Sequence, residues 1–331
     1  MDNSDDIKYM RRCLQLAACG LGRVRPNPMV GCVIVKDGCI VSEGFHQYHG
    51  GWHAERNAIL RRSGHPRTDT AQAESDLRGA TLYVNLEPCS HQGLTPPCAD
   101  LIVEKGIGRV VCSNDDPNPL VSGRGYAKLE AAGIEVVRHI LEDEGRELNR
   151  RFFTFFEKKR PYIILKWAES ADGFMAPSWR SGHPQTDTTE SGKSYWLSSQ
   201  SQTIESHRLR TEEAAILVGS QTYLDDRPQL TARLFGGRQP QPVVLDRRGR
   251  LTDVPDHWLH LCCPTLDEVM QVLFDRKIQS LIVEGGRHIL DAFISEGLYD
   301  EVRIFRSQAV LGSGLPAPAI PPIATNRLKI I

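Results

Sequence analysis

Strand-like and helix-like segments alternate along this chain in two separate runs. In the first run, apolar segments that predict strands alternate with helical periodicity, at 30–35, 80–86, 109–113 and 134–138. The second run begins at residue 162 and has further strand-like segments at 215–219, 242–246, 280–286 and 301–305. Such alternation predicts layered α/β domains with mostly parallel sheets. Since 331 residues are many for one hydrophobic core, the two runs indicate two domains.

We expect one domain over residues 1–146 and another over 161–331, joined by a connecting helix over 147–160 that stops before Pro161. A formal net charge of −1 argues against a chain that mainly neutralises nucleic-acid phosphates. There is no apolar run of membrane-spanning length and no secretion signal at the N-terminus, so we expect a cytoplasmic protein. Its nine cysteines are then expected to be free thiols or metal ligands.

Three potential metal ligands and one carboxylate stand out in the first domain. His53 and Glu55 lie at the start of a predicted helix, Cys89 follows a predicted strand, and Cys98 begins the next helix. Two thiolates and an imidazole provide the three protein ligands of a catalytic zinc, whose fourth position takes a water of lowered pKa. Glu55 is then free to carry protons.

Each part of this pattern is weak alone, because His-x-Glu often starts a surface helix and Pro-Cys often marks a buried thiol. Together the parts match the signature of zinc-dependent deaminases. A zinc ion that only stabilises a non-enzymatic scaffold is the alternative, and the combined pattern favours the catalytic interpretation.

The segment E-P-C-S-H-Q-G-L-T-P-P-C (87–98) resembles the deaminase half of the bifunctional riboflavin biosynthesis enzymes. The resemblance extends through 26–35, 44–46 and 116–125. It implies that His53, Cys89 and Cys98 bind Zn²⁺ and that Glu55 is catalytic. It also implies a pocket for an aminopyrimidine and its ribose phosphate, lined by Asn27, His46, His91, Asp116 and Asn118. Asn27 and Asn118, each between prolines, could instead only shape turns.

In the second domain, R-P-Y-I-I-L-K-W-A-E-S-A-D-G (160–173), A-I-L-V-G-S-Q-T-Y-L-D-D-R-P (215–228) and V-E-G-G (283–286) resemble the reductase half of the same enzymes. The implied fold is similar to that of dihydrofolate reductase, with Lys166 and Asp172 beside the reacting ribose. The resemblance implies that NADPH contacts Ala168, Trp196, Thr222, Asp226, Gly286 and Arg287. It implies that the substrate contacts Ser194, Arg210, Leu230, Arg233 and Glu284.

The Gly-x-Gly-x-x-Gly fingerprint of dinucleotide-binding domains is missing from the second domain. A phosphate could instead bind at the N-terminus of the helix that follows a predicted strand and the turn Gly285-Gly286. Arg247, directly after a strand, could read the 2′-phosphate of NADPH. Some features depart from the family pattern. Leu94 replaces a residue that is usually basic in the family. Arg227 lies between Asp226 and Pro228, where the family usually has Asp or Asn. The chain also ends about one strand earlier than similar reductases.

The expected function is therefore deamination of a pyrimidine ribotide followed by reduction of its ribose with NADPH. We expect a homo-oligomer that acts on this small molecule and not on nucleic acid. A monofunctional deaminase with a degenerate reductase domain is one alternative. A nucleic-acid-editing deaminase with an accessory domain is another, disfavoured by the net charge and the cysteine spacing.

Overall fold

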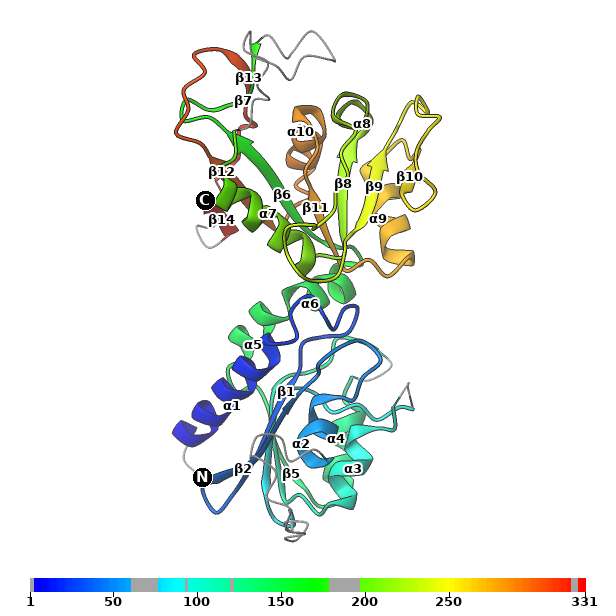
Figure 1. The fold of residues 1–331 in the computed structure, drawn as a ribbon. Coiled ribbons are helices and arrows are strands. Elements are labelled where there is room, and N and C mark those ends of the chain that lie inside the picture. Colours follow the sequence, from blue (N-terminus) through cyan, green and yellow to red (C-terminus); the bar gives the residue numbers. More distant parts are fainter. Residues whose placement is uncertain (1–2, 61–76, 93–94, 120–121, 179–196, 323–326) are drawn as a thin grey trace. The chain divides into compact units, whose positions relative to one another are not determined.

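A computed structural model describes residues 3–60, 77–92, 95–119, 122–178, 197–322 and 327–331 (Figure 1). The chain forms two compact units, Met1–Lys158 and Lys159–Ile331. In both units strands alternate with helices, so the α/β class predicted from the sequence is confirmed. Among the described residues, no helix combines the length and the apolar character that crossing a membrane requires. None of the nine cysteines, all of which lie among the described residues, forms a disulfide bond.

The first unit is a five-stranded sheet between two helical layers (Figure 1). Its strand order is β2-β1-β3-β4-β5, with β1 antiparallel to both neighbours and β3, β4 and β5 parallel. The strands are β1 Gly31–Lys36, β2 Cys39–Phe45, β3 Thr81–Leu86, β4 Arg109–Asn114 and β5 Glu135–Val137. The helices are α1 Asn3–Ala18, α2 Ala54–Leu60, α3 Cys98–Glu104, α4 Arg124–Ala131, α5 Glu142–Leu148 and α6 Arg150–Lys158.

Side-chain alternation along the strands builds a core on each face of this sheet. Cys32 and Ile34 of β1 pack on the face covered by α2, α3 and α4. Val33 and Val35 pack on the opposite face, against Tyr9, Met10 and Cys13 of α1. The helix α2, which carries the candidate catalytic carboxylate, is thus held directly on the sheet.

The helix expected over 147–160 is interrupted, because α5 ends at Leu148 and α6 begins at Arg150. Asn149 between them is buried, and its side chain is hydrogen-bonded to the backbone of Met29 in both directions, at 2.8 and 2.9 Å. This pairing ties the break to the loop before β1. Both helices fall within the first unit.

The second unit is built on a seven-stranded, fully parallel sheet of order β10-β9-β8-β11-β6-β12-β14 (Figure 1). Its strands are β6 Tyr162–Glu169, β8 Ala215–Gly219, β9 Gln241–Leu245, β10 Leu259–Leu261, β11 Ser280–Val283, β12 Glu301–Arg306 and β14 Leu328–Ile330. A separate antiparallel pair consists of β7 Phe174–Pro177 and β13 Gly314–Pro316.

Helices cover both faces of the parallel sheet. The core on one face includes residues of α9 Leu266–Asp275 and α10 Arg287–Ser295, such as Leu273 and Phe293. The core on the other includes Leu209 of α7 Gln200–Glu212 and Tyr223 of α8 Ser220–Asp226. Both faces are covered, so β8, β11 and the first half of β6 are mostly apolar, as expected for parallel strands.

Gly44 of β2 provides a test of how tightly α2 must pack on the sheet. A Cβ atom at this position would lie 2.5 Å from the backbone nitrogen of Ala58 and 2.7 Å from the carbonyl oxygen of Ala54. Gly44→Ala should therefore lower the free energy of unfolding by about 1–3 kcal/mol, because backbone cannot yield as a side chain would. Chemical denaturation followed by circular dichroism measures this.

Gly236→Ala is the matched control, because its Cβ would meet no atom within 4 Å. An equal loss of stability in both variants would contradict the packing argument.

Candidate active sites

His53, Cys89 and Cys98 meet at one point of the first unit. His53 precedes α2, Cys89 follows β3 and Cys98 is the first residue of α3. The Nδ1 atom of His53 lies 3.5 Å from Sγ of Cys89 and 3.4 Å from Sγ of Cys98. All three ligand atoms lie within 4.8 Å of one another. Residues separated by up to 45 positions in the sequence are thus brought together as the spacing predicted.

These distances fit a tetrahedral zinc ion. Bonds of about 2.0 Å to nitrogen and about 2.3 Å to sulfur put the two ligand atoms about 3.5 Å apart in a tetrahedron. The backbone nitrogen of Cys98 also donates a hydrogen bond to Sγ of Cys89 at 3.3 Å. Hydrogen bonds from the Cys98 thiol and from His53 lower the pKa of Cys89 to about 4 against the effect of burial. The thiolate that a metal requires is therefore favoured at this position.

Glu55 lies in the first turn of α2, two residues after His53, and its side chain is buried. Burial raises the pKa of Glu55, because a charged carboxylate is poorly solvated there. A carboxyl group at this position has the chemistry of a general acid–base catalyst, which must both accept and release a proton.

Asn27 and His46 lie beside the metal-ligand cluster. The rings of His46 and His53 are 5.6 Å apart and nearly perpendicular. Nδ1 of His46 lies 2.9 Å from the carbonyl oxygen of Trp52, so it carries the hydrogen, and Nε2 accepts from Asn27 Nδ2 at 3.0 Å. Burial lowers the pKa of His46, which favours the neutral ring that this pattern needs. Asn27 therefore has a specific contact here beyond shaping a turn.

Asp116 and Asn118 lie in the loop after β4. Oδ1 of the buried Asp116 accepts a hydrogen bond from the backbone nitrogen of Asn118 at 2.8 Å. Burial, with a smaller contribution from Glu87, raises the pKa of Asp116 to about 7. His91, also predicted for this pocket, has an exposed side chain. Leu94, the departure from the family pattern, lies outside the described residues.

Glu87 holds this loop in place, a role that the sequence reasoning missed. Its carboxylate accepts hydrogen bonds from the backbone nitrogens of Gly123 at 3.0 Å and Gly125 at 2.9 Å. Only glycine fits at 125, because a Cβ atom there would lie 2.0 Å from the carbonyl oxygen of Pro88. The signal was present in the sequence as a charged residue directly after a strand-like segment, just before Pro88-Cys89.

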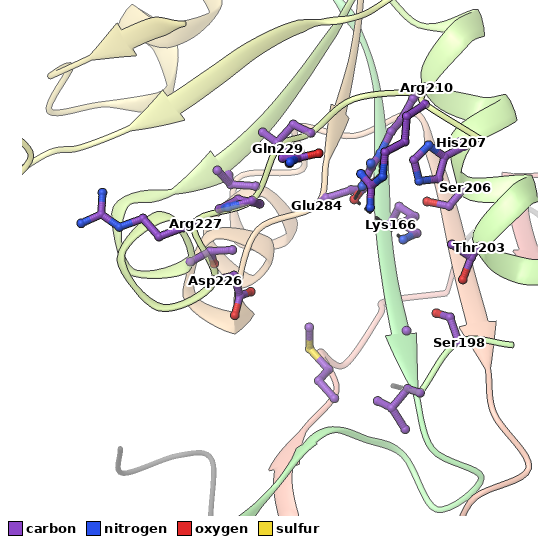
Figure 2. A pocket seen from close by; sticks show the side chains of 18 of the residues that line it. Lys166, Ser198, Thr203, Ser206, His207, Arg210, Asp226, Arg227, Gln229 and Glu284 are labelled. Atoms are coloured by element: carbon purple, nitrogen blue, oxygen red, sulfur yellow. Dashed lines mark hydrogen bonds and ion pairs between the residues drawn. The ribbon is translucent and has the colours of Figure 1, made fainter. Parts of the chain in front are cut away.

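A cavity of about 500 Å³ lies in the second unit and gathers most of the side chains predicted for the reductase site (Figure 2). Lys166 and Ala168 line it from β6, and Arg210 lines it from α7. The other predicted residues that line it are Thr222, Asp226, Leu230, Arg233 and Glu284.

Three charged side chains form a buried group in this cavity. Glu284 receives hydrogen bonds from Arg210, Nη2 to Oε2 at 2.7 Å and Nε to Oε1 at 3.3 Å. Nζ of Lys166 lies 3.8 Å from Oε2 of Glu284. Although burial opposes its ionisation, the charges of Lys166 and Arg210 lower the pKa of Glu284 to about 2. Burial lowers the pKa of Lys166, which makes its ammonium a better proton donor.

Three other residues predicted for the reductase site, Asp172, Gly286 and Arg287, are not among those that line the described cavity. Asp172 accepts hydrogen bonds from the backbone nitrogens of Leu311 at 3.0 Å and Gly312 at 2.7 Å, and it is not among the residues that line the described cavity. The backbone nitrogen of Gly286 donates to Thr222 Oγ1 at 2.9 Å, which places the start of α10 next to a cavity residue. The guanidinium of Arg287 contacts Asp291 and the carbonyl oxygen of Pro316.

Arg247 is exposed in the turn after β9 and is likewise not among the residues that line the described cavity. Ser194 and Trp196 lie outside the described residues.

On the polar face of α7, Arg210 was predicted from the sequence, but the three other residues that line the cavity were missed. Thr203, Ser206, His207 and Arg210 all line it (Figure 2). Their spacing of three, one and three residues places them on one helical face. The hydroxyl of Ser206 is buried with no hydrogen-bond partner among the described residues. The sequence alone does not show that this polar side of α7 faces the cavity and not the solvent.

Family models match both units. The model described as the cytidine and deoxycytidylate deaminase zinc-binding region matches residues 3–114. The model described as the RibD C-terminal domain matches residues 161–329.

Whole proteins match along nearly the full chain. The riboflavin biosynthesis protein RibD of Actinobacillus pleuropneumoniae is 38% identical over 93% of this chain and 85% of its own length. A solved structure of a diaminohydroxyphosphoribosylaminopyrimidine deaminase/5-amino-6-(5-phosphoribosylamino)uracil reductase from Thermotoga maritima is 38% identical, with a TM-score of 0.81, covering 97% of this chain and 93% of that one. RibD of Acinetobacter baumannii is 34% identical with a TM-score of 0.82, over 96% of this chain and 90% of that one.

The Arg210–Glu284 pair should matter for stability far more than surface pairs do. The Arg210 side chain is only 13% exposed, so Arg210→Met leaves a buried carboxylate with only the more distant Lys166. We expect a loss of about 3 kcal/mol in the free energy of unfolding, measured by chemical denaturation.

Arg208→Met on the same helix is the matched control. Arg208 is 39% exposed and pairs with Glu205 and Glu212, and such surface pairs contribute about 1 kcal/mol or less. Equal losses in the two variants would show that burial of the pair has no special effect.

Asp116 should make stability depend on pH. Its pKa in the folded protein is about 7, against 3.8 for a free side chain. Between these values the folded protein holds a proton that the unfolded chain has released, so stability falls as pH rises. The free energy of unfolding of the metal-free parent, relative to that of Asp116→Asn, should fall by up to about 1.4 kcal/mol per pH unit in this window. Urea titrations from pH 4 to 7 measure it, and parallel curves for the two proteins would refute the assignment.

Proposed function

The chain belongs to the RibD family of riboflavin biosynthesis proteins, and on that basis we propose that it performs two successive reactions on one pyrimidine ribotide. The first is hydrolytic deamination of 2,5-diamino-6-ribosylamino-4(3H)-pyrimidinone 5′-phosphate. The second is NADPH-dependent reduction of the ribosyl to the ribityl side chain. The observation that carries the proposal is the convergence of His53, Cys89 and Cys98 beside the buried Glu55.

In the deaminase unit, His53, Cys89 and Cys98 would hold Zn²⁺. Zinc, when bound, acts as a Lewis acid that lowers the pKa of a water molecule. Glu55 would take up and deliver the protons that deamination moves, at a ring nitrogen of the pyrimidine and at the departing ammonia. Its burial supports this role, because burial raises the pKa of the carboxyl and so favours uptake of a proton.

Other residues of this unit would bind the substrate. Asn27, His46, Asp116 and Asn118 are proposed to contact the aminopyrimidine and its ribose phosphate, with His91 from the loop after Cys89. The contact between Asn27 and the neutral His46 supports a fixed set of donors and acceptors beside His53. Such fixed groups can select the ring edge that reacts.

In the reductase unit, NADPH when bound supplies the hydride, and the protein orients the two reactants. Ala168, Thr222, Asp226 and the start of α10 at Gly286 and Arg287 are proposed to hold the cofactor, with Trp196 and Arg247. The cavity and its donors support this proposal.

Leu230, Arg233, Arg210, Glu284 and Ser194 would hold the ribotide. The first four line the cavity. Lys166 would donate a proton or hydrogen bond to the ribose, as the lowered pKa of its ammonium favours. Asp172 is proposed to act beside the reacting ribose, and its hydrogen bonds from the backbone of Leu311 and Gly312 would fix its position.

We also propose that the protein works in the cytoplasm as a homo-oligomer. Support for association comes from β2, an edge strand that exposes Ile40 and Val41. Exposed apolar side chains on a strand edge favour pairing with another chain. Size-exclusion chromatography with light scattering tests this, and a monomer at micromolar concentration would refute it.

Mass spectrometry of the products tests the two activities. Purified protein is incubated with the diaminopyrimidine ribotide, with and without NADPH. We expect the deaminated product alone without NADPH and the deaminated, reduced product with it. Deaminated product in both samples would support the monofunctional alternative, and unchanged substrate with folded, zinc-loaded protein would refute the proposal.

Glu55→Gln separates the two halves of the mechanism. Removing the proton carrier should lower the deamination rate by about 10²–10⁴-fold, while zinc content and reduction of deaminated substrate stay at parental levels. Glu104→Gln, on an exposed position of α3, is the control and should retain both activities. Retained deamination in Glu55→Gln would favour a zinc ion that only stabilises the fold.

A further inference from the structure

A second group of metal-binding side chains lies in the second unit, where β9 and β10 end. Asp246 follows β9, His260 lies in β10 and Cys262 follows it. The parallel register pairs Leu261 with Leu245, and Asp246 N donates to the carbonyl oxygen of Leu261 at 2.8 Å. Since residues two apart in a strand share a face, His260 and Cys262 point to the side on which Asp246 lies.

The three side chains meet at distances that suit a metal better than hydrogen bonds. Nε2 of His260 lies 3.4 Å from Oδ2 of Asp246 and 3.6 Å from Sγ of Cys262, and all three ligand atoms lie within 4.8 Å of one another. Hydrogen bonds from nitrogen to oxygen are usually about 2.7–3.2 Å long. Tetrahedral zinc, by contrast, holds a nitrogen and an oxygen ligand about 3.4 Å apart, and a nitrogen and a sulfur ligand about 3.5 Å apart.

The carboxylate of Asp246 provides an independent observation. This residue is 0% exposed, and its Oδ1 has no hydrogen-bond partner among the described residues. Oδ2 accepts from the backbone nitrogen of Leu251 at 2.9 Å. A buried carboxylate with an unpaired oxygen is costly, and the charge of a cation bound at Oδ2, the oxygen that faces His260, would offset part of that cost. The His260 side chain is 30% exposed, so solvent has access to the group.

We propose that Asp246, His260 and Cys262 form a second divalent-cation site, separate from the one at His53, Cys89 and Cys98. Carboxylate, imidazole and thiolate together favour Zn²⁺, Co²⁺ or Ni²⁺ over Mg²⁺ and Ca²⁺, which prefer oxygen ligands alone. Water from the open side completes the coordination. The bound ion joins the ends of β9 and β10 and fixes the start of the turn that carries Arg247. The proposal does not depend on either proposed activity.

Metal content is the first test. The full-length protein is loaded with Zn²⁺, dialysed against metal-free buffer, and measured by inductively coupled plasma mass spectrometry. Cys262→Ala should contain one zinc equivalent per chain fewer than the parent. Cys263→Ala, which changes the next residue on the opposite face, should keep the parental content. Equal zinc content in the parent and Cys262→Ala would overturn the proposal, as would a loss confined to Cys263→Ala.

Alkylation of the parent protein is the second test, and it needs no variant to fold. Each cysteine is followed by peptide mass spectrometry during reaction with iodoacetamide. Zn²⁺ should slow modification of Cys262, because a metal-bound thiolate is a poorer nucleophile, and leave Cys263 unchanged. Modification of Cys262 at the same rate with and without Zn²⁺ would overturn the proposal.

Discussion

Parallel pairing of strands brings their carboxyl ends to one edge of a sheet, and the sites described above depend on this constraint. In the first unit, Cys89 follows the end of β3 and Asp116 follows the end of its parallel neighbour β4. In the second unit, Lys166 lies in β6 and Glu284 follows the end of the adjacent β11. The buried apolar strands therefore fix the position of the backbone at this edge of the sheet. Polar and charged side chains just beyond the strands can then line a site.

The buried charges of the reductase cavity are explained by function better than by stability. A buried ion pair is often no more stabilising than apolar residues of the same volume, because both charges lose their water. Glu284 nevertheless lies between Arg210 and Lys166 and stays ionised. This arrangement keeps a lysine of lowered pKa fixed in a cavity, which an apolar core could not do. The free-energy cost of burying these charges is then the consequence of holding a lysine of lowered pKa in the cavity.

Sites that are defined by residue types and their spacing in the sequence could be predicted. Sites that depend on how helices and strands pack or pair could not. His53, Cys89 and Cys98 could be predicted because few residue types bind zinc and their order along the chain is restrictive. The cavity-lining role of Thr203 and Ser206 on α7 could not be predicted. Polar residues on a helix usually face solvent, and only the position of the sheet shows that these two line the cavity. The break at Asn149 was missed for a similar reason, since its partner Met29 is 120 residues away.

Asp246, His260 and Cys262 show the same limit most clearly. The sequence places Asp246 fourteen residues before His260, with a polar turn between them, and no spacing rule connects the two. Only the register of β9 on β10 makes them neighbours. A shift of that register by one residue would move His260 and Cys262 to the opposite face. The pairing of β9 with β10 is therefore what brings these three side chains together. In the same arrangement, Oδ1 of the buried Asp246 has no hydrogen-bond partner among the described residues. A cation at Oδ2, between this carboxylate and His260, would offset part of the cost of burying its charge.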